Sequence, residues 1–391
     1  MEKEKNQPGQ ELLDIDDQGN YNDNQKEKEQ KKSGSCKYCL ICICCLVILG
    51  LCCFCYYKNK CCKTNSNNKT IYDKTKLKNL NLKSRIIFGP IFDNSFNDGK
   101  MSEKWIQKFE TMANNNVALI ITEGMMVGDA SLFPPTGRKI LRIDSDDYIE
   151  EYKQLTDRVH KLNTYIIMQL NFPGLMSTSD VIYSPSPDKG FFTNVTSKEL
   201  TKEDMLRIQD LFVQGAIRGK KAGFDGIDIH AAQLNFASLF LSTKFNRRTD
   251  EYGGSVQNRA RFIVETLKKI REAIGDDMIL SIKIDSEDEA NGFTESDFLE
   301  AGKILEQAGI DLISVSGTNV FRNEELLFYE RTKKLADILK IPVVCIGGIK
   351  TYENADYVLK NSNIEYIAMA RALMKDPELV TKWTQKNKEK N

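Results

Sequence analysis

The sequence predicts an α/β protein with a (β/α)8 barrel, the TIM-barrel architecture, and three observations lead to this fold class. Eight short apolar stretches alternate with amphipathic helical patterns over about 300 residues, the length that such a barrel needs. Polar residues stand where several of these stretches end. No G-x-G-x-x-G sequence follows a stretch, which argues against the main alternative, a doubly wound sheet with a dinucleotide site.

Residues 1–37 are expected to form a disordered tail, because they are rich in Glu, Lys, Gln, Asn and Asp and contain few apolar residues. A segment of this composition cannot bury enough apolar surface to offset the entropy that it loses on ordering. The whole chain carries 55 basic and 55 acidic residues. This balance gives no electrostatic reason to expect a nucleic-acid partner.

Residues 38–57 are predicted to form a transmembrane helix, because no charged side chain lies between Lys37 and Lys58. A helix of this length spans about 30 Å, the thickness of the hydrocarbon core of a bilayer. A signal peptide would begin closer to the N-terminus. The other alternative is a zinc site built from Cys36, Cys39, Cys42 and Cys45. The apolar surroundings favour the helix, whose outer cysteines are candidates for palmitoylation.

The orientation of this helix is weakly specified, because five lysines lie between Lys26 and Lys37 before it and six lie between Lys58 and Lys76 after it. Residues 58–80 are rich in Lys and Asn and are expected to be a linker, and residues 81–391 are expected to form the barrel. Ten of the eleven cysteines lie between Cys36 and Cys62. The predicted barrel, with Cys345 alone, therefore has no disulfide framework and no predicted metal site, which fits a reducing compartment.

The stretches predicted as strands are rich in Val, Ile and Leu, as expected of parallel strands that are buried on both faces. They are Arg85–Ile91, Val117–Glu123, Tyr165–Leu170, Gly226–His230, Met278–Ile284, Leu312–Val315, Val343–Ile346 and Tyr366–Met369. The helical patterns between them include Asp147–Leu162, Lys202–Lys221, Gln257–Ile274, Glu295–Gln307 and Asn354–Lys360.

The ends of the predicted strands nominate a ligand site, because polar side chains there face the mouth of a barrel. Gln169 ends the third strand, His230 ends the fourth, and Lys283 lies near the end of the fifth. Gly347-Gly348 follows the seventh strand and Ala370-Arg371 follows the eighth, where barrels often bind phosphate. Taken singly, these residues also suit ordinary turns or core packing. Together they suit a phosphorylated planar cofactor.

Residues 77–385 resemble the old yellow enzyme family, the FMN-dependent NAD(P)H:flavin oxidoreductases and ene-reductases. The motifs that carry the resemblance are Gly223-Phe224-Asp225-Gly226, His230-Ala231-Ala232, Asp250-Glu251-Tyr252-Gly253-Gly254-Ser255 and Ala370-Arg371-Ala372-Leu373. The resemblance implies FMN as the cofactor, NAD(P)H as the reductant and a small molecule as the electron acceptor.

The resemblance also implies which residues hold the flavin ring. Pro90 and Ile91 would seat its plane, and Gly124 would let the ring approach the second strand. Gln169 would hydrogen-bond the pyrimidine edge. Lys283 stands where the family usually has Arg and would stabilise negative charge beside flavin N1 and O2, although Lys lacks the planar fork of Arg.

The same resemblance places the phosphate on Gly348, Ala370 and Arg371, and the oxygen of the substrate on His230. The second residue of the oxygen-binding pair, His or Asn in the family, is here Gln233. The proton-donating Tyr of the family is replaced by Asn235, and Phe92 stands where the family has Thr or Cys. The residues expected to hold the flavin therefore follow the family more closely than those expected to handle the substrate.

The sequence thus predicts a membrane-tethered FMN oxidoreductase that takes hydride from NAD(P)H. It would pass the hydride to a quinone, an α,β-unsaturated carbonyl or a nitro compound by a ping-pong mechanism. The barrel is expected to face the cytosol, where FMN and NAD(P)H are available. The alternative is a flavin-binding scaffold or sensor that has lost turnover. The oligomeric state and the choice between NADH and NADPH stay open.

Overall fold

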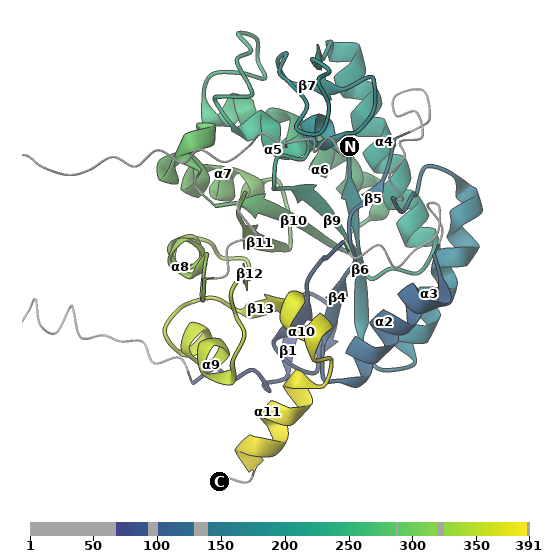
Figure 1. The fold of residues 1–391 in the computed structure, drawn as a ribbon, viewed down its shortest axis with the longest axis vertical. Coiled ribbons are helices and arrows are strands. Elements are labelled where there is room, and N and C mark those ends of the chain that lie inside the picture. Colours follow the sequence, from purple (N-terminus) through teal and green to yellow (C-terminus); the bar gives the residue numbers. More distant parts are fainter. Residues whose placement is uncertain (1–67, 93–100, 129–139, 287, 319–323, 389–391) are drawn as a thin grey trace, which may run out of the picture. The chain divides into compact units, whose positions relative to one another are not determined.

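The structure is a computed structural model, and its described residues form a barrel of parallel strands surrounded by helices (Figure 1). The described ranges are 68–92, 101–128, 140–286, 288–318 and 324–388. The predicted tail at 1–37 and the predicted transmembrane helix at 38–57 lie outside them. Within these ranges, no helix is both long enough and apolar enough to cross a bilayer.

Eight strands close the barrel, as predicted. Their order in the sheet is β4-β3-β13-β12-β11-β10-β9-β6, and β4 also pairs with β6, so the ring has no free edge. They are β3 (Ile86–Phe88), β4 (Leu119–Ile121), β6 (Tyr165–Asn171), β9 (Gly226–Ala231), β10 (Ile279–Asp285), β11 (Leu312–Ser316), β12 (Val343–Ile346) and β13 (Tyr366–Met369). The two-residue strand β5 (Met125–Met126) extends β6. β3 ends earlier than predicted, because Pro90 has no backbone N–H to give to a neighbouring strand.

The helices lie outside the ring, with α2, α3 and α4 on one side of the strands in Figure 1 and α7, α8 and α9 on the other. They are α2 (Glu103–Asn114), α3 (Ile149–His160), α4 (Lys202–Lys221), α6 (Val256–Ile274), α7 (Glu295–Gln307), α8 (Tyr329–Ala336) and α9 (Tyr352–Lys360). Both α4 and α7 begin and end where predicted. The Thr201 and Thr294 side chains accept hydrogen bonds from Asp204 N and Asp297 N, which fixes the start of each helix.

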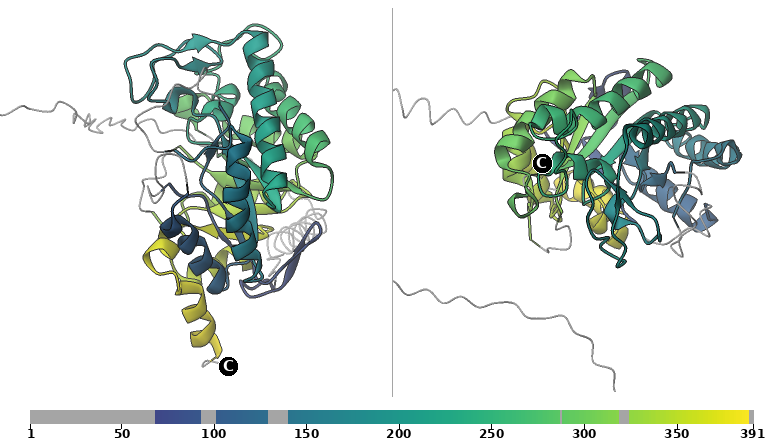
Figure 2. Two further views of the ribbon diagram at one scale, coloured as in Figure 1. Left: turned by 90° about the vertical axis from the view of Figure 1, so that its right-hand side faces the viewer. Right: turned by 90° about the horizontal axis from the view of Figure 1, so that it is seen from above.

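A hairpin occupies part of the segment that was predicted to be a linker. β1 (Thr75–Leu77) and β2 (Leu80–Leu82) pair antiparallel, and their three leucines are buried with residues of the barrel strands such as Ile87. The structured unit therefore begins before residue 81. Lys and Asn between these leucines hide the alternating apolar pattern. In the left view of Figure 2 this hairpin lies at the opposite end of the molecule from β7 (Tyr183–Ser184) and β8 (Lys198–Glu199).

An aromatic cluster anchors the short helix α5 (Phe236–Leu241), which follows β9. The Phe236 and Phe240 rings lie 5.4 and 4.5 Å from the Phe262 ring of α6, measured between centroids. The side chains of Phe236 and Phe240 are fully buried, so Phe236 points into the core and not into the barrel mouth.

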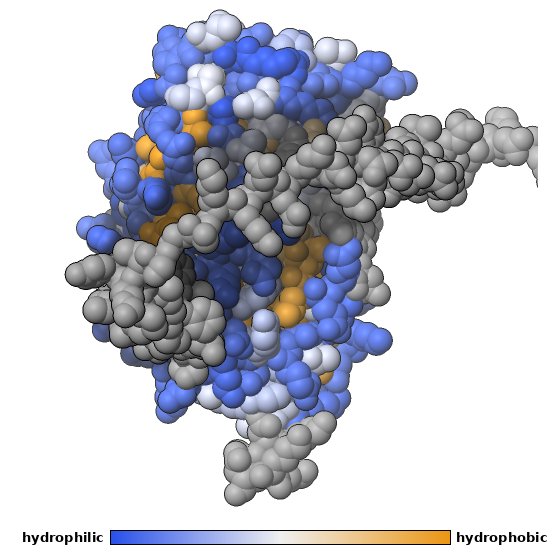
Figure 3. Space-filling model, turned by 90° about the vertical axis from the view of Figure 1, so that its left-hand side faces the viewer, coloured by the Kyte–Doolittle hydropathy of each residue, from blue (hydrophilic) through white to orange (hydrophobic). Residues whose placement is uncertain are grey.

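The surface that carries α7, α8 and α9 is mainly hydrophilic, and its hydrophobic groups are concentrated in a recess (Figure 3).

Candidate functional site

Three buried polar residues on neighbouring strands form the floor of the candidate site. The Gln169 Nε2 of β6 donates to Asp228 Oδ2 of β9 over 2.8 Å, and the Ser281 Oγ of β10 donates to Asp228 Oδ1 over 2.6 Å. None of the three is more than 1% exposed. Asp228 therefore orients the Gln169 amide, and the side-chain oxygen of Gln169 can accept a hydrogen bond from a ligand.

A buried cation lies above this floor. Lys283 of β10 stands opposite His230 of β9 in the register of the two strands, and both side chains are buried. Burial lowers the pKa of Lys283 to about 8, although the carboxylates of Asp228 and Asp285 act to raise it. Lys283 is therefore still mostly protonated at neutral pH and places a positive charge inside the mouth.

The environment of His230 selects one tautomer of its ring. Burial, with a smaller effect from the charge of Lys283, holds the pKa of His230 well below its usual value, so the ring is neutral. Asn235 Nδ2 lies 3.2 Å from His230 Nε2 and 3.0 Å from the Ala232 carbonyl oxygen. Because an amide N–H can only donate, Nε2 is the accepting nitrogen and Nδ1 carries the proton. That Nδ1 is buried and has no hydrogen-bond partner among the described residues, so it is a donor available to a ligand.

Gln233 and Leu234 form a tight left-handed turn between β9 and α5, with φ angles of 59° and 58°. Such angles cost a non-glycine residue roughly 1–3 kcal/mol and persist only where surrounding contacts hold them. The backbone N of Gln233 donates to both carboxylate oxygens of Asp285, at 3.0 and 2.8 Å. Its side-chain Nε2 donates to Ser316 Oγ over 3.2 Å. The chain thus brings Gln233 to the same mouth as His230, but its amide is turned toward β11.

The residues predicted to seat a planar ring lie at the ends of β3 and β4. Pro90 and Ile91 follow β3 and are half-buried, and Ile91 packs against the core. Phe92, next in the chain, is 51% exposed. A Cβ added to Gly124 would lie 2.8 Å from the Cβ of Asn171, so only glycine fits there.

The residues predicted to bind phosphate follow β12 and β13. Gly348 has a φ of 74°, and a Cβ on it would lie 2.4 Å from the Glu324 carbonyl oxygen. The close approach of the chain before α8 therefore already requires glycine at this position. Ala370 precedes the short helix α10 (Arg371–Lys375), and Arg371 is exposed. The Arg371 guanidinium makes no ion pair or hydrogen bond with another residue that the structure describes, so it is available to an anion.

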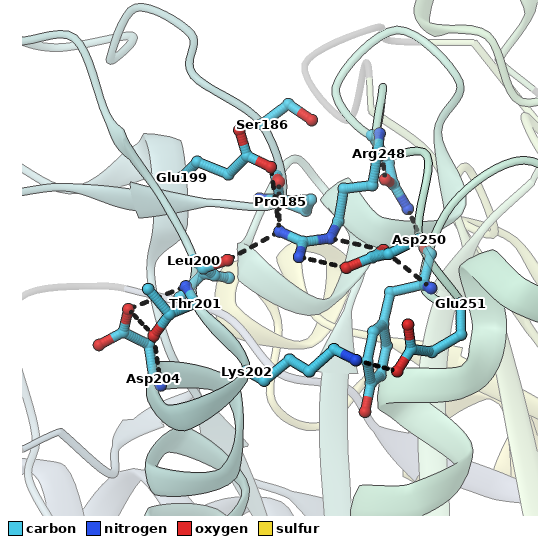
Figure 4. A network of polar contacts seen from close by, with 12 residues as sticks. Pro185, Ser186, Glu199, Leu200, Thr201, Lys202, Asp204, Arg248, Asp250 and Glu251 are labelled. Carbon is cyan, nitrogen blue, oxygen red and sulfur yellow. Dashed lines mark hydrogen bonds and ion pairs between the residues drawn. The ribbon is translucent and has the colours of Figure 1, made fainter.

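The motif Asp250–Ser255 and the neighbouring Arg248 prove to be largely architectural (Figure 4). Arg248 pairs with Asp250 over 2.6 Å and donates to the carbonyl oxygens of Leu200 and Pro185 over 2.8 and 3.1 Å. These contacts tie the loop before α6 to the β7–β8 segment. The second histidine, His160, is also structural, because it lies at the end of α3, 2.8 Å from the carboxylate of Asp225.

Sequence reasoning missed Asp285, the last residue of β10. The signal was present, because alternate residues of this strand, Ser281, Lys283 and Asp285, are all polar in an otherwise apolar stretch. Alternation of this kind places the three side chains on one face of the strand. Asp285 therefore faces the interior together with Lys283.

Comparisons with known proteins match most of this chain to one family of enzymes. Residues 70–391 match the NADH:flavin oxidoreductase / NADH oxidase family. An NADPH dehydrogenase of Bacillus velezensis is 33% identical over 315 residues, which are 77% of this chain and 90% of that protein. An NADH oxidase of Thermoanaerobacter brockii is 30% identical over 338 residues, which are 82% of this chain but only 50% of that protein.

Solved structures of several enzymes show the same fold, and two of them serve as examples. Morphinone reductase has a TM-score of 0.72 at 22% identity, and the match covers 82% of this chain and 91% of that one. An old yellow enzyme homologue from Zymomonas mobilis has a TM-score of 0.70 at 22% identity, covering 81% of this chain and 93% of that one.

Proposed function

Because the chain belongs to the NADH:flavin oxidoreductase / NADH oxidase family, and is an FMN-dependent NAD(P)H oxidoreductase, we propose that it reduces small electron acceptors by a ping-pong mechanism. NAD(P)H binds at the mouth first, and the acceptor takes its place after NAD(P)+ has left. The acceptors are quinones, α,β-unsaturated carbonyl compounds and nitro compounds. The observation that carries this proposal is the buried Nδ1–H of His230, which has no hydrogen-bond partner among the described residues and can donate to a ligand oxygen.

The described residues fit FMN. When bound, FMN accepts hydride from NAD(P)H and gives it to the acceptor. The Gln169 oxygen, oriented by Asp228, would accept from the ring N–H, and Lys283 would face the edge on which negative charge develops. Gly124 would let a flat ring approach the second strand, as the family resemblance implies, and Arg371 would offer its guanidinium to the phosphate.

His230 holds the acceptor in place during reduction. Its Nδ1–H donates to a carbonyl, quinone or nitro oxygen, while Asn235 keeps the proton on that nitrogen through its contact with Nε2. A hydrogen bond of this kind positions the acceptor and stabilises negative charge that develops on its oxygen. NAD(P)H, which has a carboxamide oxygen, would use the same donor in the first half of the cycle.

Asn235 makes quinones the preferred acceptors. Reduction of an activated C=C bond needs a proton at carbon, and an amide cannot release one at neutral pH. The Asn235 amide is moreover occupied by Ala232 O and His230 Nε2. A quinone takes up its proton on oxygen and depends less on a donor at this position. We expect kcat/KM to be higher for a quinone than for a simple enone; faster reduction of the enone would contradict the proposal.

Arg371→Ala is expected to weaken FMN binding by about one to two orders of magnitude. A hydrogen bond to a charged group contributes roughly 1.5–3 kcal/mol, and Arg371 has no other described partner whose loss would disturb the fold. FMN affinity of wild type and variant should be compared by fluorescence titration of the apoprotein. Arg331→Ala, a change of charge on α8, serves as the control. FMN retention equal to that of the wild type would refute the assignment of the phosphate site.

We also propose that residues 38–57 tether the protein to a membrane, with the barrel in the cytosol. The support is the uncharged stretch itself and the supply of FMN and NAD(P)H in the cytosol. The full chain should stay in the membrane fraction through a carbonate wash, and a variant lacking residues 1–60 should not. Protease should digest the barrel in sealed vesicles whose cytosolic side faces outward; protection would contradict this orientation.

A further inference from the structure

Asp285 is a buried acid at the edge of the candidate site that has no part in the function described so far. It is the last residue of β10, two residues beyond Lys283, and it is 7% exposed. Both of its carboxylate oxygens accept from the backbone N of Gln233, at 3.0 and 2.8 Å. Asp285 therefore contacts the turn that carries one member of the predicted oxygen-binding pair.

A small cavity adjoins Asp285. Its volume is about 20 Å³, and its polar lining includes Asp285, Asp288, Ser242 and Thr318, with Leu234 and Phe293 among the apolar residues. A cavity needs roughly 10–15 Å³ and two to four polar partners to hold a water molecule, so this one can hold a single water. Asp288 is half-buried and accepts a 2.7 Å hydrogen bond from Asn291 Nδ2, and Asn291 also lines the cavity.

Burial keeps a proton on Asp285 near neutral pH. It is the largest effect and raises the pKa of Asp285 to about 7, and the charge of Asp288, from the following turn, also raises it. The backbone N–H of Gln233 and the charge of Lys283, from its own strand, act in the opposite direction. His230 and Asp228 lie on the neighbouring strand β9, and the His230 ring is neutral. Asp285 is thus protonated below about pH 7 and ionised above it.

We propose that Asp285 supplies the proton that the acceptor oxygen takes up, and that the adjoining cavity carries the water that reprotonates it. The inference rests on the proposed function and extends it. In quinone reduction, NAD(P)H provides a hydride by way of FMN, which brings two electrons and one hydrogen nucleus. The hydride supplies one O–H group of the hydroquinone. The O–H bond of Asp285 breaks as a new O–H bond forms on the other quinone oxygen, which completes the hydroquinone and leaves Asp285 as a carboxylate. The carboxylate then regains a proton from solvent through the cavity water.

The variant Asp285→Asn tests the role of the titratable proton separately from the hydrogen bond to the Gln233 backbone N–H. The Asn oxygen still accepts from the Gln233 N–H, so the strained turn keeps its partner, but the titratable proton is lost. The raised pKa means that the stability associated with Asp285 is complete below its unfolded pKa and is lost as pH rises through about 7. The amide has no such dependence, so at pH 8 the variant should be at least as stable as the wild type, which Tm measurements on both proteins will show.

The expected result is a selective loss in the second half of the cycle. In anaerobic stopped-flow experiments on the full-length holoenzyme, oxidation by a quinone at pH 6 should be about 10²- to 10⁴-fold slower in Asp285→Asn than in the wild type, the usual contribution of a positioned acid. The wild-type rate should fall as pH rises through about 7, and the variant should lack this decline. Reduction by NAD(P)H should be the same in both.

Two further measurements make the test decisive. Asp311→Asn makes the same chemical change at the start of β11, at the other end of the barrel strands, and should leave the pH profile unaltered. In the apoprotein, ¹³C NMR of labelled Asp carboxyl groups should show one resonance that titrates near pH 7 in the wild type and is missing in Asp285→Asn. This readout does not depend on FMN or on turnover.

Three outcomes would overturn the inference: an unchanged pH profile in Asp285→Asn, equal slowing of both halves of the cycle, or no carboxyl that titrates near pH 7. Equal slowing would assign Asp285 a structural role only. Failure of the proposed function looks different, because a wild-type enzyme would then accept hydride from NAD(P)H and transfer it to none of the acceptors.

Discussion

Asn235→Tyr is expected to raise kcat/KM for an enone by about 10²- to 10⁴-fold, the usual contribution of a positioned general acid. Position 235 lies beside His230, where its side chain is within 3.2 Å of the imidazole. Phe236 does not compete for this space, because its ring is packed against Phe172 and Phe262 in the core. A phenol here can therefore deliver a proton to the carbon of the substrate. The quinone rate should change much less.

The control for this prediction is Asn235→Phe, which brings the same ring without the hydroxyl. Both variants lose the amide contact to His230 Nε2, so the difference between them reports the hydroxyl alone. Steady-state rates for one enone and one quinone should be measured in all three proteins. If Tyr and Phe reduce the enone equally fast, or if the wild type is already as fast as the Tyr variant, another group supplies the proton to carbon.

Lys283→Met is expected to slow the reduction of bound FMN by NAD(P)H by about 10²- to 10³-fold, the usual cost of removing one group that stabilises developing negative charge. Methionine keeps the length and the apolar stem of lysine but removes the charge. It also leaves Asp228 and Asp285 without the cation that lowers their pKa, so both carboxyls should hold their protons more tightly.

Lys283→Arg is the matched control, because Arg restores a cation and adds the planar fork of hydrogen-bond donors. The single-turnover rate of FMN reduction should be compared at saturating FMN, so that weaker cofactor binding does not enter the result. An unaltered rate in Lys283→Met would show that the cation does not act on the flavin, and its role would then be limited to the buried charge cluster.

Much of the fold could be predicted because local and global signals agree. The barrel strands are buried on both faces and read as mainly apolar runs, and α4 and α7 carry a Thr at the N-cap. The short helix α5 was missed because Phe236–Leu241 is apolar except for Ser238 and shows no helical period. The hairpin β1–β2 was missed because Lys and Asn surround its leucines.

The site residues that lie at the ends of strands could be predicted from the sequence. The positions of side chains that depend on the turn after β9 could not. Gln169, His230 and Lys283 come to one mouth because each ends or nearly ends a strand. The left-handed turn at Gln233 directs its amide to Ser316, although resemblance alone pairs it with His230 on a ligand oxygen. The contact between Asn235 and His230 depends on the same turn, and no local sequence pattern specifies it.

Anaerobic stopped-flow mixing of the purified full-length holoenzyme with NADPH, followed by a quinone, tests the central claim most directly. The account predicts that NADPH bleaches the absorbance of bound FMN and that the quinone then restores it within the time of one turnover. A protein that retains FMN but shows no bleaching with NADPH or NADH would contradict the account and support the alternative, a flavin-binding scaffold without turnover.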